Sequence, residues 1–170
     1  MSFKETSEII AVSFTLTELG ANTFVEDEVA LQLDVLNNEI AVIYAVDLNC
    51  QEPDAITSTN TAVRASLSST SRTSVGTLGA TNTLAVAGDA IRAGAFGPGD
   101  GGVGFSRSAN ETYQANLGFI GLIATNNFFV QLIGENNANP KNVTGRVWLK
   151  RARADSSTYA ALVQSEVLSS

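Results

Sequence analysis

The sequence contains no histidine and a single cysteine, Cys50, among its 170 residues. Without histidine the chain cannot use a Ser-His or Cys-His pair as a nucleophile, and it lacks the imidazole ligands that zinc and copper sites favour. One cysteine cannot form a disulfide within the chain, and because Cys50 follows an apolar run we expect a buried free thiol. These absences predict a protein that is not an enzyme and needs no metal or other cofactor.

Charged residues are also scarce, at 16% of the chain against ~25% in typical soluble domains. Serine, threonine, asparagine and glycine take their place. A surface poor in lysine and glutamate is typical of proteins that associate with themselves, because interfaces are depleted in those residues. The same composition is typical of a β-sandwich with many turns, and at this point both interpretations stay open.

Long hydrophobic runs are missing as well, although 44% of the residues are hydrophobic. No run approaches the ~18 apolar residues of a membrane span. The first residues, MSFKE, lack the apolar stretch of a secretory signal. We therefore expect a single domain over residues 1–170, made in a cytoplasm and without a membrane span.

Apolar and polar residues alternate along most of the chain, which predicts an all-β fold. In the first such segment Ile10, Val12, Phe14 and Leu16 fall on one face of a strand. Predicted strands cover residues 7–17, 28–36, 39–49, 61–70, 103–108, 117–124, 128–134 and 143–152. Short strands at this spacing predict an eight-stranded antiparallel β-sandwich, jelly-roll-like in its connections.

Two segments have helical features instead. Leu84, Ala87 and Ile91 have helical spacing and predict one internal helix at residues 83–95. Asp155, followed by two serines, predicts the cap of a short C-terminal helix within residues 155–168. Residues 97–102, GPGDGG, lack the GK[ST] ending of a phosphate-binding loop and are predicted to be a flexible surface loop.

Acidic and basic residues separate along the sequence. Residues 1–54 carry eleven acidic residues and one basic residue, whereas residues 55–170 carry six acidic and nine basic residues. Five of the ten basic residues lie close together: Lys141, Arg146, Lys150, Arg151 and Arg153. This layout favours contact between copies of the chain, acidic face to basic face. A solvated face and a nucleic-acid strip are the alternatives, and five basic residues on an acidic protein make nucleic acid an unlikely partner.

The predicted strand 143–152 supplies the best candidate for a contact surface. Arg146, Trp148 and Lys150 share one of its faces, and Trp and Arg dominate the binding energy of protein interfaces. Together with Arg151 and Arg153 they are the predicted subunit or partner contacts. The alternative is that Trp148 packs beneath the C-terminal helix while the basic side chains reach solvent.

A sandwich with a flexible glycine loop, few charges, no histidine and segregated charge resembles the single jelly-roll proteins of viral particles, either coat or capsid-decorating proteins. The resemblance implies a structural virion protein, made in the host cytoplasm, that assembles with copies of itself or with another capsid protein. The acidic net charge of −7 departs from coats that bind RNA directly. The alternative is a carbohydrate- or receptor-binding β-sandwich of a fibre or surface protein, with the Asn-rich loop 135–142 supplying polar contacts.

Overall fold

The computed structural model describes residues 3–110 and 118–169, and these form an all-β fold with one C-terminal helix. The strands are β1 (Phe3–Glu5), β2 (Ile10–Thr17), β3 (Val25–Ala30), β4 (Glu39–Cys50), β5 (Thr61–Ser68), β6 (Thr83–Arg92), β7 (Val103–Arg107), β8 (Ala109–Asn110), β9 (Gly121–Ile123), β10 (Asn127–Glu135) and β11 (Asn142–Ala154). A short 3-10 helix, η1 (Val35–Asn37), precedes β4, and α1 (Ser156–Ser169) follows β11.

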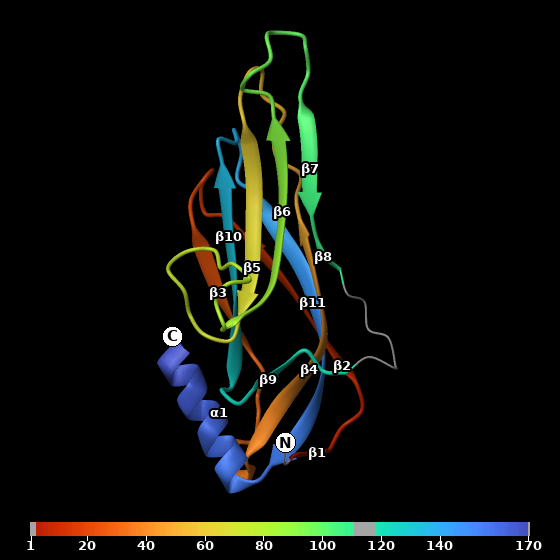
Figure 1. Ribbon diagram of the computed structural model, residues 1–170, viewed down its shortest axis with the longest axis vertical. Coiled ribbons are helices and arrows are strands. Elements are labelled where there is room, and N and C mark those ends of the chain that lie inside the picture. Colours follow the sequence, from red (N-terminus) through yellow and green to blue (C-terminus); the bar gives the residue numbers. More distant parts are fainter. Residues whose placement is uncertain (1–2, 111–117, 170) are drawn as a thin grey trace.

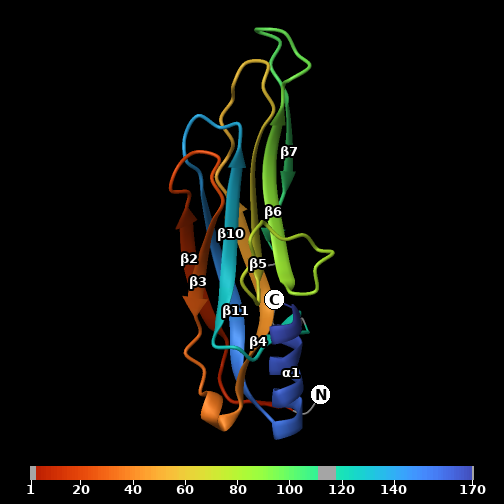
Figure 2. The same ribbon diagram turned by 90° about the vertical axis from the view of Figure 1, so that its left-hand side faces the viewer.

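The strands form two antiparallel sheets that pack face to face (Figures 1 and 2). The six-stranded sheet has the order β1-β11-β4-β8, with β2 also pairing with β11 and β9 also pairing with β4. The five-stranded sheet has the order β3-β10-β5-β6-β7. The predicted all-β sandwich is therefore confirmed, but the prediction of eight strands is wrong, because the described residues form six-stranded and five-stranded sheets.

The core lies between the sheets and follows from the alternation along each strand. Ile43 of the six-stranded sheet and Val63, Phe128 and Leu132 of the five-stranded sheet are fully buried there. Cys50 belongs to the same cluster, as predicted, and carries a free thiol. Burial, with a smaller contribution from the charge of Asp89, raises the pKa of this thiol to about 12.

The prediction of an internal helix at residues 83–95 is wrong, because these residues form strand β6. The spacing of Leu84, Ala87 and Ile91 matches a helix only by coincidence. Ala85 and Ala87 face the core, which places Gly88 on the outer face of the sheet. Pairing with β5 along its length satisfies the backbone groups of this strand, and Gly88 would have weakened a helix. Residues 97–102 lie in the exposed connection between β6 and β7.

The predicted strand at residues 28–36 is displaced in the structure. Strand β3 starts at Val25 and ends at Ala30, and Gln32 then adopts a positive φ of 54°. Such a conformation ends an extended strand, and the chain continues into η1. Leu31 and Leu33 nevertheless stay buried in the core, which is why the apolar alternation continues beyond the strand.

The C-terminal helix is confirmed, as is its predicted cap. The Asp155 carboxylate accepts a hydrogen bond from the backbone N–H of Thr158 at 2.7 Å. Tyr159, Leu162 and Val163 pack on a small apolar cluster formed by the outer face of the six-stranded sheet. Figures 1 and 2 show α1 at the same end of the sandwich as β1. Across the described ranges, no helix is both long and apolar enough to cross a membrane.

We predict that Gly145→Ala destabilises the fold. Gly145 lies in β11 beneath the ring of Phe14, and a Cβ at this position would meet that ring and come within 2.7 Å of the carbonyl oxygen of Asp47. The expected loss in the free energy of unfolding is about 1–3 kcal/mol, because a side chain and a backbone must both shift. Urea denaturation measures it.

Gly104→Ala is the matched control, since nothing lies within 4 Å of a Cβ built at Gly104. We expect a change of less than about 0.5 kcal/mol for this exposed position. Equal losses in the two variants would show that crowding at Gly145 does not limit stability.

Candidate functional site

The predicted contact residues of β11 divide between the two faces of that strand. Arg146, Trp148 and Lys150 point outward from the six-stranded sheet, whereas Val147 and Leu149 point into the core. Arg151 and Arg153 follow the alternation of the core-facing residues and lie beyond the core, at the end of the sandwich. The structure therefore brings together three of the five predicted residues and separates the other two from them.

The three outward residues interact with neighbours in their own chain. Arg146 donates from Nε to Ser13 Oγ at 3.0 Å, and its guanidinium lies 5.8 Å from the centre of the Trp148 ring. Lys150 Nζ lies 2.9 Å from a carboxylate oxygen of Glu5 and 5.3 Å from the centre of the Tyr44 ring. The predicted strip is therefore a mixed surface of aromatic, basic and acidic side chains.

Two further basic residues of this segment are paired with acids from the N-terminal third. Arg151 binds Glu39 at 2.6 Å and also donates to the backbone carbonyl of Leu31. Lys141, which is buried, binds Asp54 at 2.6 Å. Part of the charge separation that is visible along the sequence is thus neutralised inside one molecule, by the ion pairs of Lys141, Lys150 and Arg151.

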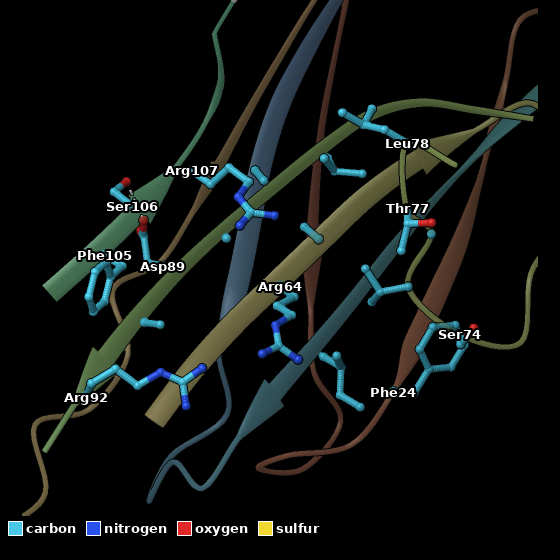
Figure 3. A pocket seen from close by; sticks show the side chains of 18 of the residues that line it. Phe24, Arg64, Ser74, Thr77, Leu78, Asp89, Arg92, Phe105, Ser106 and Arg107 are labelled. Carbon is cyan, nitrogen blue, oxygen red and sulfur yellow. Dashed lines mark hydrogen bonds between the residues drawn. The ribbon is translucent and has the colours of Figure 1, made fainter. Parts of the chain in front are cut away.

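A second surface, which the sequence did not indicate, lies on the outer face of the five-stranded sheet. It is a groove of about 980 Å³ between strand β7 and the loop of residues 69–82 (Figure 3). Three arginines from adjacent strands line it: Arg64 of β5, Arg92 of β6 and Arg107 of β7. Figure 3 shows Arg64 and Arg107 near the middle of this face, Arg92 and Phe105 toward one side and Phe24 on the other.

The strand register fixes the positions of these arginines. Arg64 pairs with Gly88, and Gly88 pairs in turn with Arg107, so one glycine separates the two arginines in a single cross-strand row. Arg92 lies four residues beyond Gly88 on the same strand and therefore shares its face. Since Gly88 has no side chain, nothing projects from the sheet between Arg64 and Arg107.

The loop that walls the groove is held by a buried polar network. Gln131 is fully buried, accepts a hydrogen bond from Ser66 at 2.6 Å, and donates to Ser68 and to Glu26 at 2.8 Å. Ser66 also accepts the backbone N–H of Gly76 in the loop. Buried polar groups that are fully hydrogen-bonded hold a segment in one conformation, so this wall is anchored to the sheet.

Sequence reasoning missed the groove because its arginines are distant in the chain. The prediction of a helix at residues 83–95 also concealed the strand pairing that places Gly88 between Arg64 and Arg107. One signal was present: all four basic residues between positions 55 and 140 are arginines, namely Arg64, Arg72, Arg92 and Arg107.

Acidic residues form no metal site in the part of the chain that the structure describes. Glu26, Asp27 and Glu28, which follow one another in β3, alternate between the two faces of the sheet and therefore do not converge. Within residues 3–110 and 118–169 no group of three or more Cys, Asp or Glu side chains could hold an ion.

Comparison with known proteins adds little to this geometry. No protein-family model and no curated protein matches the sequence. Among solved structures, a chain from Desmodium yellow mottle tymovirus matches 84% of this chain and 87% of its own length, with 12% sequence identity and a TM-score of 0.34. A likeness at this level carries no argument about function, so the interpretation rests on the residues themselves.

We predict that Asp54→Asn destabilises the protein at neutral pH and much less at acidic pH. Hydrogen bonds from Lys141 and from the backbone N–H groups of Asn139 and Ala138 hold the pKa of Asp54 below its usual value. A carboxylate with a lowered pKa stabilises the fold above the unfolded-state pKa and loses that contribution as the pH falls through the folded-state pKa. Urea denaturation at pH 7, 5 and 3 measures the difference.

Glu52→Gln serves as the control, because Glu52 is an exposed acid in the neighbouring sequence. Its effect on stability is expected to be small at each pH. A loss for Asp54→Asn that does not shrink with acidification would show that the carboxylate charge is not what stabilises this contact.

Proposed function

We propose that this protein is a structural subunit that acts by assembling with copies of itself, as a coat or capsid-decorating protein of a virus particle. In this proposal the protein belongs to the virion, is made in the host cytoplasm, catalyses no reaction and uses no cofactor. A second capsid protein is a further proposed partner. One observation carries the proposal: the five-stranded sheet ends in two open edge strands of opposite charge.

Both edges of this sheet lack a further strand in the described part of the chain. Strand β3 pairs with β10 alone, and β7 pairs with β6 alone. All five residues of β7 are exposed, including Val103 at 46% and Phe105 at 59%. An edge of this kind presents a row of backbone N–H and C=O groups to any strand that approaches it.

The two edges differ in charge. Strand β3 carries Glu26, Asp27 and Glu28 in succession, and β7 carries Arg107 with Arg92 beside it on β6. Like charges facing each other disfavour the pairing of two β3 edges, while opposite charges favour β3 of one copy against β7 of the next. The acidic charge of β3 thus disfavours contact between two β3 edges and favours contact between β3 of one copy and β7 of the next.

The sheet order also determines how such copies would be arranged. Four antiparallel steps separate β3 from β7, so the two edge strands run in the same direction. A neighbouring copy in the same orientation would pair with β7 as a parallel strand. This contact is head-to-tail. It produces a closed ring when a whole number of copies, each rotated by the same angle, completes a full turn.

The order of the strands supports a jelly-roll assignment, which is also part of the proposal. Strands β2-β11-β4-β9 face strands β3-β10-β5-β6, and the chain crosses between the sheets from β2 to β3, from β3 to β4 and from β4 to β5. Eight strands in two Greek keys define a jelly roll, and viral capsid and lectin domains both use this fold. Because a fold does not determine a function, the open edges are the stronger argument.

The outer face of the six-stranded sheet is a second proposed contact. Arg146 is exposed and Trp148 half-buried there, beside the exposed part of β2. A contact at this face would place a Trp and an Arg, residues typical of interface centres, between two copies.

We predict that Glu28→Arg on β3 abolishes self-association at neutral pH, because it places like charges opposite Arg107 of the next copy. Light scattering after size-exclusion chromatography gives the mass, and negative-stain electron microscopy shows the particles. Glu52→Arg is the matched control, since it makes the same charge change at an exposed residue outside the strands. It should assemble as the unmodified chain does.

Two outcomes would contradict the edge contact. If the unmodified chain stays a monomer at all concentrations and salt conditions tested, self-assembly is not its function. If Glu28→Arg assembles normally while Arg146→Glu or Trp148→Ala does not, the contact lies on the outer face of the six-stranded sheet. Circular dichroism confirms that each variant remains folded.

A further inference from the structure

We propose that the arginine groove of the five-stranded sheet binds an anionic oligosaccharide, a sugar chain that carries sulfate or carboxylate groups on more than one of its residues. The groove is defined by Arg64, Arg92 and Arg107, by Gly88 and Ala90 between them, and by the loop of residues 69–82. This inference concerns a ligand on a sheet face, whereas the proposed self-assembly uses the sheet edges. Arg107 of edge strand β7 belongs to both surfaces, and Arg64 and Arg92 lie on the inner strands β5 and β6.

The spacing of the arginines favours a ligand with more than one anionic group. Arg64 and Arg107 start from strands on either side of Gly88, so their Cα atoms are separated by two strand spacings, ~10 Å. Arg92 starts four residues beyond Gly88, ~13 Å along the strand. A ligand with several anionic groups can engage each arginine separately at this spacing, and anionic groups on successive sugars have a spacing of this order.

The guanidinium groups are available for such a ligand. Among the residues that the structure describes, no hydrogen bond or ion pair engages the guanidinium of Arg92 or Arg107. Arg64 meets Glu135 at 3.4 Å with both side chains 54% exposed, and an ion pair of this kind contributes little and is easily exchanged. The planar guanidinium matches the geometry of carboxylate and sulfate, which it can bind through two parallel hydrogen bonds.

The surface between the arginines suits sugar rings. Gly88 and Ala90 form a low floor, and Phe105 and Leu78 lie exposed at its two sides. Sugar rings have apolar C–H faces that pack against aromatic and aliphatic side chains, while their charged substituents extend sideways to the arginines. A groove of about 980 Å³ is large enough for several sugar residues.

The charges around the groove disfavour a nucleic acid. DNA and RNA carry a phosphate on every nucleotide, and binding is driven by many contacts with basic residues. Here three arginines line the groove, the chain carries a net charge of −7, and β3 presents Glu28 on the same face of the sheet. A continuous row of phosphates would meet this acidic strand, whereas a shorter ligand with spaced charges avoids it.

The test measures binding of a sulfated tetrasaccharide derived from heparin by isothermal titration calorimetry, with maltotetraose as the neutral probe. We expect the sulfated sugar to bind and maltotetraose not to bind. Arg92→Ala and Arg107→Ala should each weaken binding about tenfold or more, because each removes charge-assisted hydrogen bonds. Arg153→Ala is the matched control, an exposed arginine on the other sheet, and should change affinity less than about twofold.

Several results would overturn the proposal. Equal losses of affinity for Arg153→Ala and Arg92→Ala would indicate that the sulfated sugar is attracted to positive charge in general and does not bind at this groove. Tighter binding of a thymidine oligonucleotide, or of a poly-aspartate peptide, at the same arginines would assign the groove to a nucleic acid or to an acidic protein segment. No binding of the sulfated sugar would exclude the site, and the light-scattering mass of the same sample reports self-assembly separately.

Discussion

Most of this architecture depends on the pairing of β11 with three earlier strands. It is the longest strand, and it lies between β4 on one side and β1 and β2 on the other. The register of β11 places Arg146 opposite Asp47 and Lys150 near Glu5. The strand also supplies Ala152 to the apolar cluster beneath α1. The position of the helix, the division of the predicted contact residues and the ion pairs of Lys150 and Arg151 follow from this register.

The sequence predicted the elements whose alternation is regular and failed where other constraints decided. Strands β2, β4, β5, β10 and β11 are long enough for a period of two to be unambiguous, and the cap at Asp155 identified α1. Strand β6 was missed because small residues such as Ala85 and Ala87 suit several conformations and because Gly88 disrupts any pattern. The groove could not be predicted, since pairing between strands distant in sequence brings its arginines together, and local patterns carry no information about such pairing.

Several carboxylates act inside the protein as acceptors for backbone N–H groups. Glu18, which is buried, accepts from Thr23, Gly134 and Lys141, so that one side chain ties three segments together. Glu166 of α1 does the same for Ala124 and the residue after it. Such acids leave fewer carboxylates on the surface than the composition suggests. In β3, Glu26 is also used in this way, whereas Asp27 and Glu28 stay exposed.

The position of β11 after the strands with which it pairs has a consequence for folding. Because β2 and β4 meet through β11, the six-stranded sheet cannot close before β11 has been synthesised. Long-range pairing of this kind makes folding slow, and the partly made chain exposes strand edges that are open to wrong partners. Until β11 is in place, the core face of the five-stranded sheet has no complete partner sheet to pack against, so the sandwich folds before its sheet edges can act as specific contacts.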